Sequence, residues 1–140
     1  MKLKMAVVGK DVSESLSPKM HTFIMNKLGV DITYDKVSID PVDFKAKFPC
    51  ILSEYDTLNI TIPYKLDVIP YMNELKEDGK IFMSINTIDC RTKFGYNTDG
   101  AGFMLMISLL NLTIGIILEV VVKKHRQLFE LIYIRNNKKM

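Results

Sequence analysis

Hydroxyl, amide, ammonium and carboxylate side chains follow several apolar segments of this chain, and together they could bind and react with a small polar molecule. Ser, Thr and Asn side chains both donate and accept hydrogen bonds, as the hydroxyls of a polyol require. Lys65 is a candidate general acid or base, and Asp99 is the carboxylate that we expect to orient its ammonium group. The other candidates for ligand binding are Ser15, Ser17, Asn59, Thr61 and Asn86.

Each candidate also has a simpler interpretation. Ser17 and Asp99 could only cap helices, Asn86 could only form a turn, and Lys65 could be a solvated surface lysine. Ser15 and Ser17, however, lie beside a predicted helix N-terminus, whose free amides and dipole favour an anion such as a carboxylate. We favour a shared site because the candidates recur where the chain leaves successive predicted strands.

The elements that would position these residues alternate between strands and helices. Apolar or β-branched runs predict strands at 4–8, 32–39, 57–62, 81–89 and 94–97. Ser-Pro at 17–18 and Asp-Pro at 40–41 predict helix starts, since proline suits the first helical turn. The predicted helices are 17–28, ended by Gly29, then 40–52, short pieces at 66–69 and 71–75, and one opened by Asp99-Gly100.

This order predicts an α/β fold: a three-layer mixed, mainly parallel sheet with helices on both faces. In such sheets, ligands bind beyond the carboxyl ends of the strands. Asn59 and Thr61 are two residues apart and so share one strand face, while Ile60 and Ile62 take the other. His21 lies inside a predicted helix, where we expect a packed or hydrogen-bonded histidine rather than a base.

The composition fits one globular domain and excludes several other classes of protein. Hydrophobic residues make up 48% and charged residues 25%, which argues against disorder. Cys50 and Cys90 alone form neither a disulfide scaffold nor a four-ligand metal site, so we expect both to be small buried residues in a reducing cytosol. Residues 123–140 hold six basic side chains and one acidic one. We interpret this basic segment as a solvated end of the chain rather than a nucleic-acid site.

Four segments of the chain resemble motifs of the shikimate dehydrogenases. Residues 15–21 (Ser-Leu-Ser-Pro-Lys-Met-His) are similar to S-L-S-P-x-x-H, and residues 59–65 (Asn-Ile-Thr-Ile-Pro-Tyr-Lys) to N-x-T-x-P-x-K. Residues 85–87 (Ile-Asn-Thr) resemble the end of A-[VI]-N-T, and 97–103 resemble N-T-D-x-x-G-F. The motifs come in the family's order, so the resemblance covers the substrate-binding domain, at about 1–112.

The resemblance implies reversible, NADPH-dependent reduction of 3-dehydroshikimate to shikimate in aromatic amino-acid biosynthesis. It leaves quinate open as another substrate and NAD as another cofactor. By motif, Lys65 would be the proton donor and acceptor, paired with Asp99. Ser15 and Ser17 would bind the substrate carboxylate. The ring hydroxyls would be bound by Asn59, Thr61, Asn86 and Asp99.

The resemblance stops where the family continues into an NADP-binding Rossmann domain. Residues 119–125 (Glu-Val-Val-Val-Lys-Lys-His) stand where glycines belong, and Gly100-Ala101-Gly102 is followed by Leu105 instead of a third glycine. No cofactor-binding residues are therefore identifiable. We expect a substrate domain at 1–112 and an aberrant or vestigial tail at 113–140, with 119–140 read out of frame and the chain inactive alone.

Other classes of function stay open. The chain could be a non-catalytic module that binds shikimate-like acids, a remnant, or a protein that self-associates through exposed apolar surface. Residues 103–122 are apolar and long enough to be considered as a membrane span, although Asn111, Thr113 and Glu119 interrupt them. We expect a cytoplasmic protein with no membrane or nucleic-acid partner.

Overall fold

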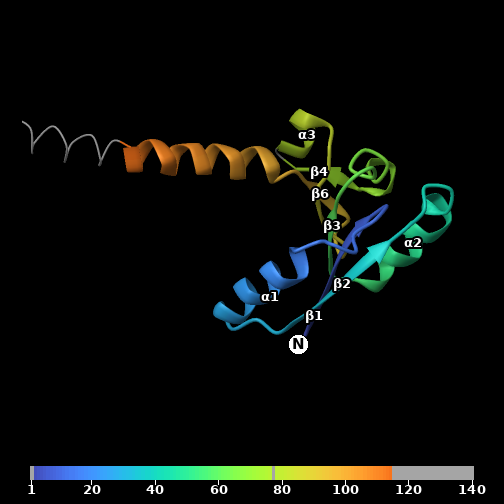
Figure 1. Ribbon diagram of the computed structural model, residues 1–140. Coiled ribbons are helices and arrows are strands. Elements are labelled where there is room, and N and C mark those ends of the chain that lie inside the picture. Colours follow the sequence, from blue (N-terminus) through green and yellow to red (C-terminus); the bar gives the residue numbers. More distant parts are fainter. Residues whose placement is uncertain (1, 77, 115–140) are drawn as a thin grey trace, which may run out of the picture. The chain divides into compact units, whose positions relative to one another are not determined.

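The computed structural model describes residues 2–76 and 78–114. Up to Gly100 the chain forms one compact unit, and the helix that spans 99–114 continues into a second unit. The first half alternates as β1 (Leu3–Gly9), α1 (Ser17–Lys27), β2 (Ile32–Ser38), α2 (Phe44–Glu54) and β3 (Thr57–Ile60) (Figure 1). The second half holds the 3-10 helix η1 (Ile69–Tyr71), β4 (Glu74–Leu75), α3 (Asp78–Phe82), β5 (Thr87–Asp89) and β6 (Phe94–Tyr96).

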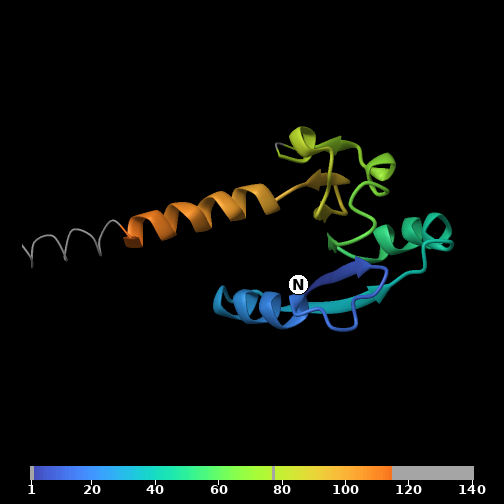
Figure 2. The same ribbon diagram turned by 45° about the horizontal axis from the view of Figure 1, so that its top comes forward.

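The six strands form one mixed sheet in the order β2-β1-β3-β5-β6-β4. β1 pairs in parallel with both β2 and β3, and Figure 2 shows β1 and β2 pointing the same way. β4 is parallel to β6, whereas β5 is antiparallel to both β3 and β6. The predicted mixed, mainly parallel α/β sheet is confirmed.

The two faces of this sheet have different chemistry because side chains alternate along each strand. One face is apolar and fully covered, and α2 lays Phe44, Phe48 and Leu52 on it. On the opposite face α1 packs against β1 and β2, over Met5 and Val7. The strand residues of the apolar face are Ala6, Val8, Leu58, Ile60 and Ile88.

An aromatic cluster fills the core beneath α2. The rings of Phe44 and Tyr64 stack with centroids 4.2 Å apart, and those of Phe44 and Phe48 stack at 4.9 Å. Tyr71 meets Phe48 edge-on at 5.1 Å. The buried hydroxyl of Tyr64 donates a hydrogen bond to the Ile39 carbonyl, so this ring can lie in the core without an unpaired polar atom.

Several predicted boundaries are wrong for local reasons. Asp40 does not open a helix: its Oδ1 accepts the Val42 amide in a turn, and α2 begins at Phe44. Residues 81–86 are not part of a strand, because α3 ends at Phe82 and Met83 takes a left-handed conformation with φ 46°. Only Tyr71 of the predicted helix at 71–75 is helical, as the last residue of η1, and Glu74 and Leu75 form β4 instead. The first helix ends at Lys27, and Gly29, the predicted stop, follows its cap in a left-handed conformation with φ 71°.

The two cysteines differ. Cys90 is buried as expected, and burial raises the pKa of its thiol to about 12. Cys50 is exposed, so that expectation is wrong. The reason is helical spacing: α2 buries Phe44, Phe48 and Leu52, which recur every four residues, and position 50 falls on the opposite side.

Residues 2–76 and 78–114 contain no helix that is long and apolar enough to cross a membrane. The proposed span at 103–122 extends beyond residue 114 and lies partly outside the described residues. The predicted tail also lies outside them beyond residue 114, so the division at 112 remains a prediction.

Replacing Phe48 by alanine should lower the free energy of unfolding by about 3–5 kcal/mol, because a fully buried ring would leave a cavity between α2 and the sheet. Urea denaturation followed by circular dichroism measures the change. Val42→Ala is the matched control, since Val42 is 87% exposed and its change should stay within about 0.5 kcal/mol. Equal losses in both variants would contradict this description of the core.

Candidate active site

A pocket of about 620 Å³ lies on the α1 side of the sheet, where β3 ends. Six of the seven predicted site residues line it: Ser17, Asn59, Thr61, Lys65, Asn86 and Asp99. Ser15 lines an adjoining pocket of about 350 Å³, which shares Val7, Ser17 and Thr61 with the first. The structure thus brings the predicted residues to one region of the surface.

Antiparallel strand pairing brings these residues together. The sequence had instead suggested that they meet at the carboxyl ends of parallel strands. Asn86 was expected where the chain leaves a strand and falls within the strand predicted at 81–89, but it precedes β5, which Thr87 begins. Thr87 pairs with Asn59 on one side and with Tyr96 on the other. The start of β5 therefore lies between the end of β3 and the end of β6.

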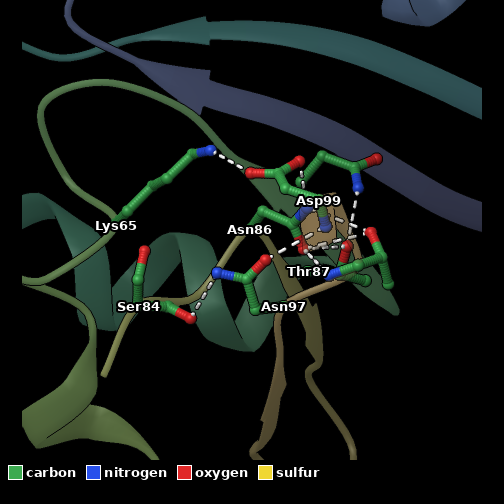
Figure 3. A network of polar contacts seen from close by, with 8 residues as sticks. Lys65, Ser84, Asn86, Thr87, Asn97 and Asp99 are labelled. Carbon is green, nitrogen blue, oxygen red and sulfur yellow. Dashed lines mark hydrogen bonds and ion pairs between the residues drawn. The ribbon is translucent and has the colours of Figure 1, made fainter. Parts of the chain in front are cut away.

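Lys65 reaches the site from the loop after β3. Its carbonyl accepts the Ile85 amide at 2.9 Å, which fixes its backbone next to Asn86. Its Nζ lies 2.5 Å from Oδ2 of Asp99 (Figure 3). The Lys65 side chain is only 33% exposed and that of Asp99 is 59% exposed, so the pair lies at the edge of the pocket and in contact with water.

Asn86 holds the other side of Asp99. Its Nδ2 donates to Oδ1 of Asp99 at 2.7 Å and to Oγ1 of Thr98 at 3.0 Å, while its Oδ1 accepts the Thr98 amide (Figure 3). Both carboxylate oxygens of Asp99 are thus engaged outside its own helix. This argues against the simple capping role, and it makes Asn86 a partner of the carboxylate.

Asn97 ties the two segments of the site together. It is the buried polar side chain of this region, 9% exposed. Its Nδ2 donates to the Ser84 carbonyl at 3.1 Å, and its Oδ1 accepts the Asp99 amide at 3.0 Å (Figure 3). The chain before Asn86 and the start of the 99–114 helix are held in a fixed relation as a result.

The ion pair shifts the titration of Asp99. The hydrogen bond from Lys65 lowers the pKa of the carboxyl, aided by the bond from Asn86 and the charge of Lys65, while partial burial acts in the opposite direction. The net shift of the Asp99 pKa is downward, so the pair favours the ionised carboxylate. An ionised Asp99 keeps Lys65 oriented toward the pocket.

Thr61 is positioned by close contact with the end of β1. Its amide donates to the Val8 carbonyl at 2.9 Å. A Cβ at Gly9 would lie 2.5 Å from Cγ2 of Thr61. Glycine at position 9 therefore lets the threonine side chain lie against the strand and face the pocket.

Three further residues take part in the polar network of the site and were not predicted: Tyr34, Thr87 and Thr98. Thr87 and Thr98 stood in the motifs already, next to Asn86 and Asp99. No local sequence pattern pointed to Tyr34, which reaches the pocket face because β2 pairs with β1 in the register that sets it beside Met5. His21 stacks on Tyr34 with centroids 5.0 Å apart and an interplanar angle of 19°, and burial lowers its pKa, as expected for a packed histidine.

Comparison with known proteins points to one family. Residues 7–88 match the family described as "Shikimate dehydrogenase substrate binding domain". The Staphylococcus aureus (strain MSSA476) "Shikimate dehydrogenase (NADP(+))" is 40% identical over 105 residues, which is 73% of this chain and 39% of that protein. The chain therefore spans well under half the length of the curated relatives it matches.

Solved structures agree with the sequence match. Shikimate dehydrogenase 1 from Peptoclostridium difficile superposes with a TM-score of 0.72 at 28% identity, over 78% of this chain and 42% of that one. A Thermus thermophilus shikimate 5-dehydrogenase, crystallised with NADP(H) and shikimate, gives a TM-score of 0.71 at 25% identity over 78% and 42%. The resemblance seen in the four motifs is confirmed by both comparisons.

Replacing Lys65 by methionine should raise the pKa of Asp99 toward the ordinary value of an aspartate, because its main hydrogen-bond donor is lost. A carboxyl whose pKa is lowered by folding adds stability above its unfolded pKa, and that stability is lost as the pH falls through the folded pKa. The acid limb of the wild-type stability curve should therefore be steeper than that of the variant.

A carbon-detected NMR titration of the Asp99 carboxyl measures the shift. Lys47→Met is the control, since it removes the separate ion pair with Asp43 on α2 and should leave Asp99 unchanged. The same Asp99 pKa in wild type and in both variants would contradict this prediction, because it would show that the ion pair does not affect the titration of Asp99.

Proposed function

Because the chain belongs to the shikimate dehydrogenase substrate-binding domain family, we propose that its pocket binds shikimate and 3-dehydroshikimate, with Lys65 and Asp99 serving proton transfer. The observation that carries this proposal is the contact of 2.5 Å between Lys65 Nζ and Asp99 Oδ2 in the pocket wall. The chemistry expected from that pair is general acid–base catalysis at a ring oxygen.

The donors and acceptors of the pocket match a cyclic acid that carries several hydroxyls. The Oγ of Ser15 accepts the Ser17 amide at 3.3 Å, which leaves its proton free for a carboxylate. Ser17 is the first residue of α1, where helix amides and the dipole favour an anion. Asn59 and Thr61, across the pocket from the helix, are placed to bind ring hydroxyls.

The reaction implied for the whole family also needs a nicotinamide cofactor, and the curated relatives are named for NADP(+). The described residues do not fit that cofactor. Gly100 and Gly102 lie inside the 99–114 helix, not in a turn between a strand and a helix, so they cannot cradle a pyrophosphate. We therefore derive the binding and proton-transfer roles of this chain and no step through the nucleotide.

Lys65 and Asp99 have distinct roles in this proposal. The ammonium of Lys65 would supply the proton that a ring carbonyl oxygen takes up when the carbonyl is reduced to a hydroxyl, and the neutral amine would take that proton back on oxidation. The hydride would be exchanged with the nicotinamide cofactor, which the described residues do not hold. Asp99 stays ionised, holds Lys65 in place and accepts a hydrogen bond from the ring hydroxyl beside it. Asn86 fixes the second carboxylate oxygen, so the acid cannot rotate away from the lysine.

Shikimate should bind the isolated chain, and Thr61→Val should weaken that binding about fivefold, because a hydroxyl that faces the pocket is replaced by a methyl group of similar size. Isothermal titration calorimetry gives the dissociation constant. Thr33→Val is the control, since Thr33 lies on β2 outside the pocket.

The absorbance of NADPH, followed with shikimate and NADP(+), separates the functional classes. Binding without turnover supports a substrate-binding module, whereas turnover requires a nucleotide site beyond the residues described. Failure of shikimate and 3-dehydroshikimate to bind at millimolar concentration would refute the proposal and favour a remnant.

A further inference from the structure

Tyr34 lies on β2, separated by one strand from Asn59 on β3, and it contacts the site through Asn59. It comes from β2, in register with Met5, and is half-buried on the pocket face of the sheet. Its hydroxyl donates to Oδ1 of Asn59 at 2.6 Å. The two residues are separated by β1, so the long phenol side chain spans the middle strand to make this contact.

This hydrogen bond decides which way the Asn59 amide faces. The phenol donates its proton to the carbonyl oxygen of the amide, and this arrangement turns Nδ2 away from Tyr34. Burial raises the pKa of Tyr34 to about 12, with a smaller opposing effect of a hydrogen bond with Ser17, so the phenol keeps its proton at neutral pH. The Nδ2 group of Asn59 then donates to Oγ1 of Thr87 at 3.2 Å.

The same direction of donation continues to the catalytic pair. The Oγ1 of Thr87 donates to Oδ1 of Asn86 at 3.1 Å, and Nδ2 of Asn86 donates to Oδ1 of Asp99. Along this series of hydrogen bonds, the Asn59 and Asn86 amides both have their oxygen toward Tyr34 and their nitrogen toward Asp99. The Tyr34 hydroxyl is the first donor in the series, and reversing the Asn59 amide would require both Tyr34 and Thr87 to exchange their roles as donor and acceptor.

The Tyr34 ring is itself held by a stacking contact. The His21 ring stacks on it from α1 with centroids 5.0 Å apart, and burial lowers the pKa of that histidine, which favours its uncharged form. Residues on β2 and α1 thus fix a ring whose hydroxyl acts on β3. The packing favours one orientation of the phenol, which a positioning role requires.

We propose that Tyr34 is a positioning residue that fixes the Asn59 amide with its nitrogen toward the pocket, so that Asn59 presents a hydrogen-bond donor to a ring oxygen of the bound acid. This role rests on the proposed function for its ligand, but the orientation of the amide is a property of the chain alone. One of the two Nδ2 hydrogens is used by Thr87, and the other is left for the ligand.

Tyr34→Phe tests the role with little change of shape. Shikimate binding should weaken about fivefold, the effect of losing one oriented hydrogen bond. The side-chain amide signals of Asn59 in a nitrogen–proton NMR spectrum should shift in the variant without any ligand. Tyr55→Phe is the matched control, because the Tyr55 hydroxyl donates to Asp35 at 3.0 Å outside the pocket.

A double-mutant cycle separates positioning from a general structural effect. Asn59→Asp keeps an acceptor for Tyr34 and removes the donor, so adding Tyr34→Phe to it should weaken shikimate binding little further. Additive losses would mean that Tyr34 acts on binding by some route other than Asn59, and would overturn the proposal. Urea denaturation of each variant shows whether the fold is retained.

The two proposals fail in different ways. If Tyr34→Phe leaves both the Asn59 signals and shikimate binding as in wild type, the positioning role is wrong and the proposed function stands. If wild type does not bind shikimate, the proposed function fails, and the Asn59 signals alone decide whether Tyr34 orients the amide. Shifted signals in Tyr55→Phe as well would also overturn the specific role of Tyr34.

Discussion

The antiparallel pairing of β3 with β5 is the constraint on which the site depends. It sets Asn59 opposite Thr87, and the pairing of β5 with β6 then sets Thr87 opposite Tyr96. Three segments that are far apart in the sequence end at one point as a result. A shift of one residue in this register would turn Asn59 toward the core and Leu58 toward the pocket, so the buried face also protects the site.

The two faces of the strands divide stability from chemistry. Leu58 and Ile60 are almost fully buried under α2, and Asn59 between them faces the pocket. Burial of the apolar side chains, at about 25 cal/mol per Å² of apolar surface, supplies the driving force for folding. The polar face can therefore hold hydroxyls and amides that would weaken a core.

The polar network positions side chains more than it stabilises the fold. An exposed ion pair contributes about 0–1 kcal/mol, and the Lys65–Asp99 pair is in contact with water. The network instead sets the orientation of Asp99. Lys65 and Asn86 hold its carboxylate, and Asn97 holds its backbone amide. Among the residues described, every fully buried side-chain nitrogen or oxygen has a hydrogen-bond partner, as a rigid site requires.

Local patterns in the sequence were enough to determine the class of fold and the types of residue in the site. Alternating apolar runs gave β1, β2 and β3 to within two residues of their observed ends, and Gly29 marked the end of α1. The strand prediction failed at 81–86, where the chain forms the end of a short helix and a turn. A short apolar run has no hydrophobic periodicity that distinguishes a helix from a strand.

Only the tertiary structure decided how the residues meet. A short apolar run does not reveal where its strand begins or in which direction it pairs. Asn86 was therefore expected within the strand predicted at 81–89, near its exit, although it precedes β5. Tyr34 gave no signal either, since a tyrosine in a strand is ordinary and its contact with Asn59 crosses β1. Residue types and spacing are local properties of the chain, whereas register and amide orientation arise only when distant segments pair.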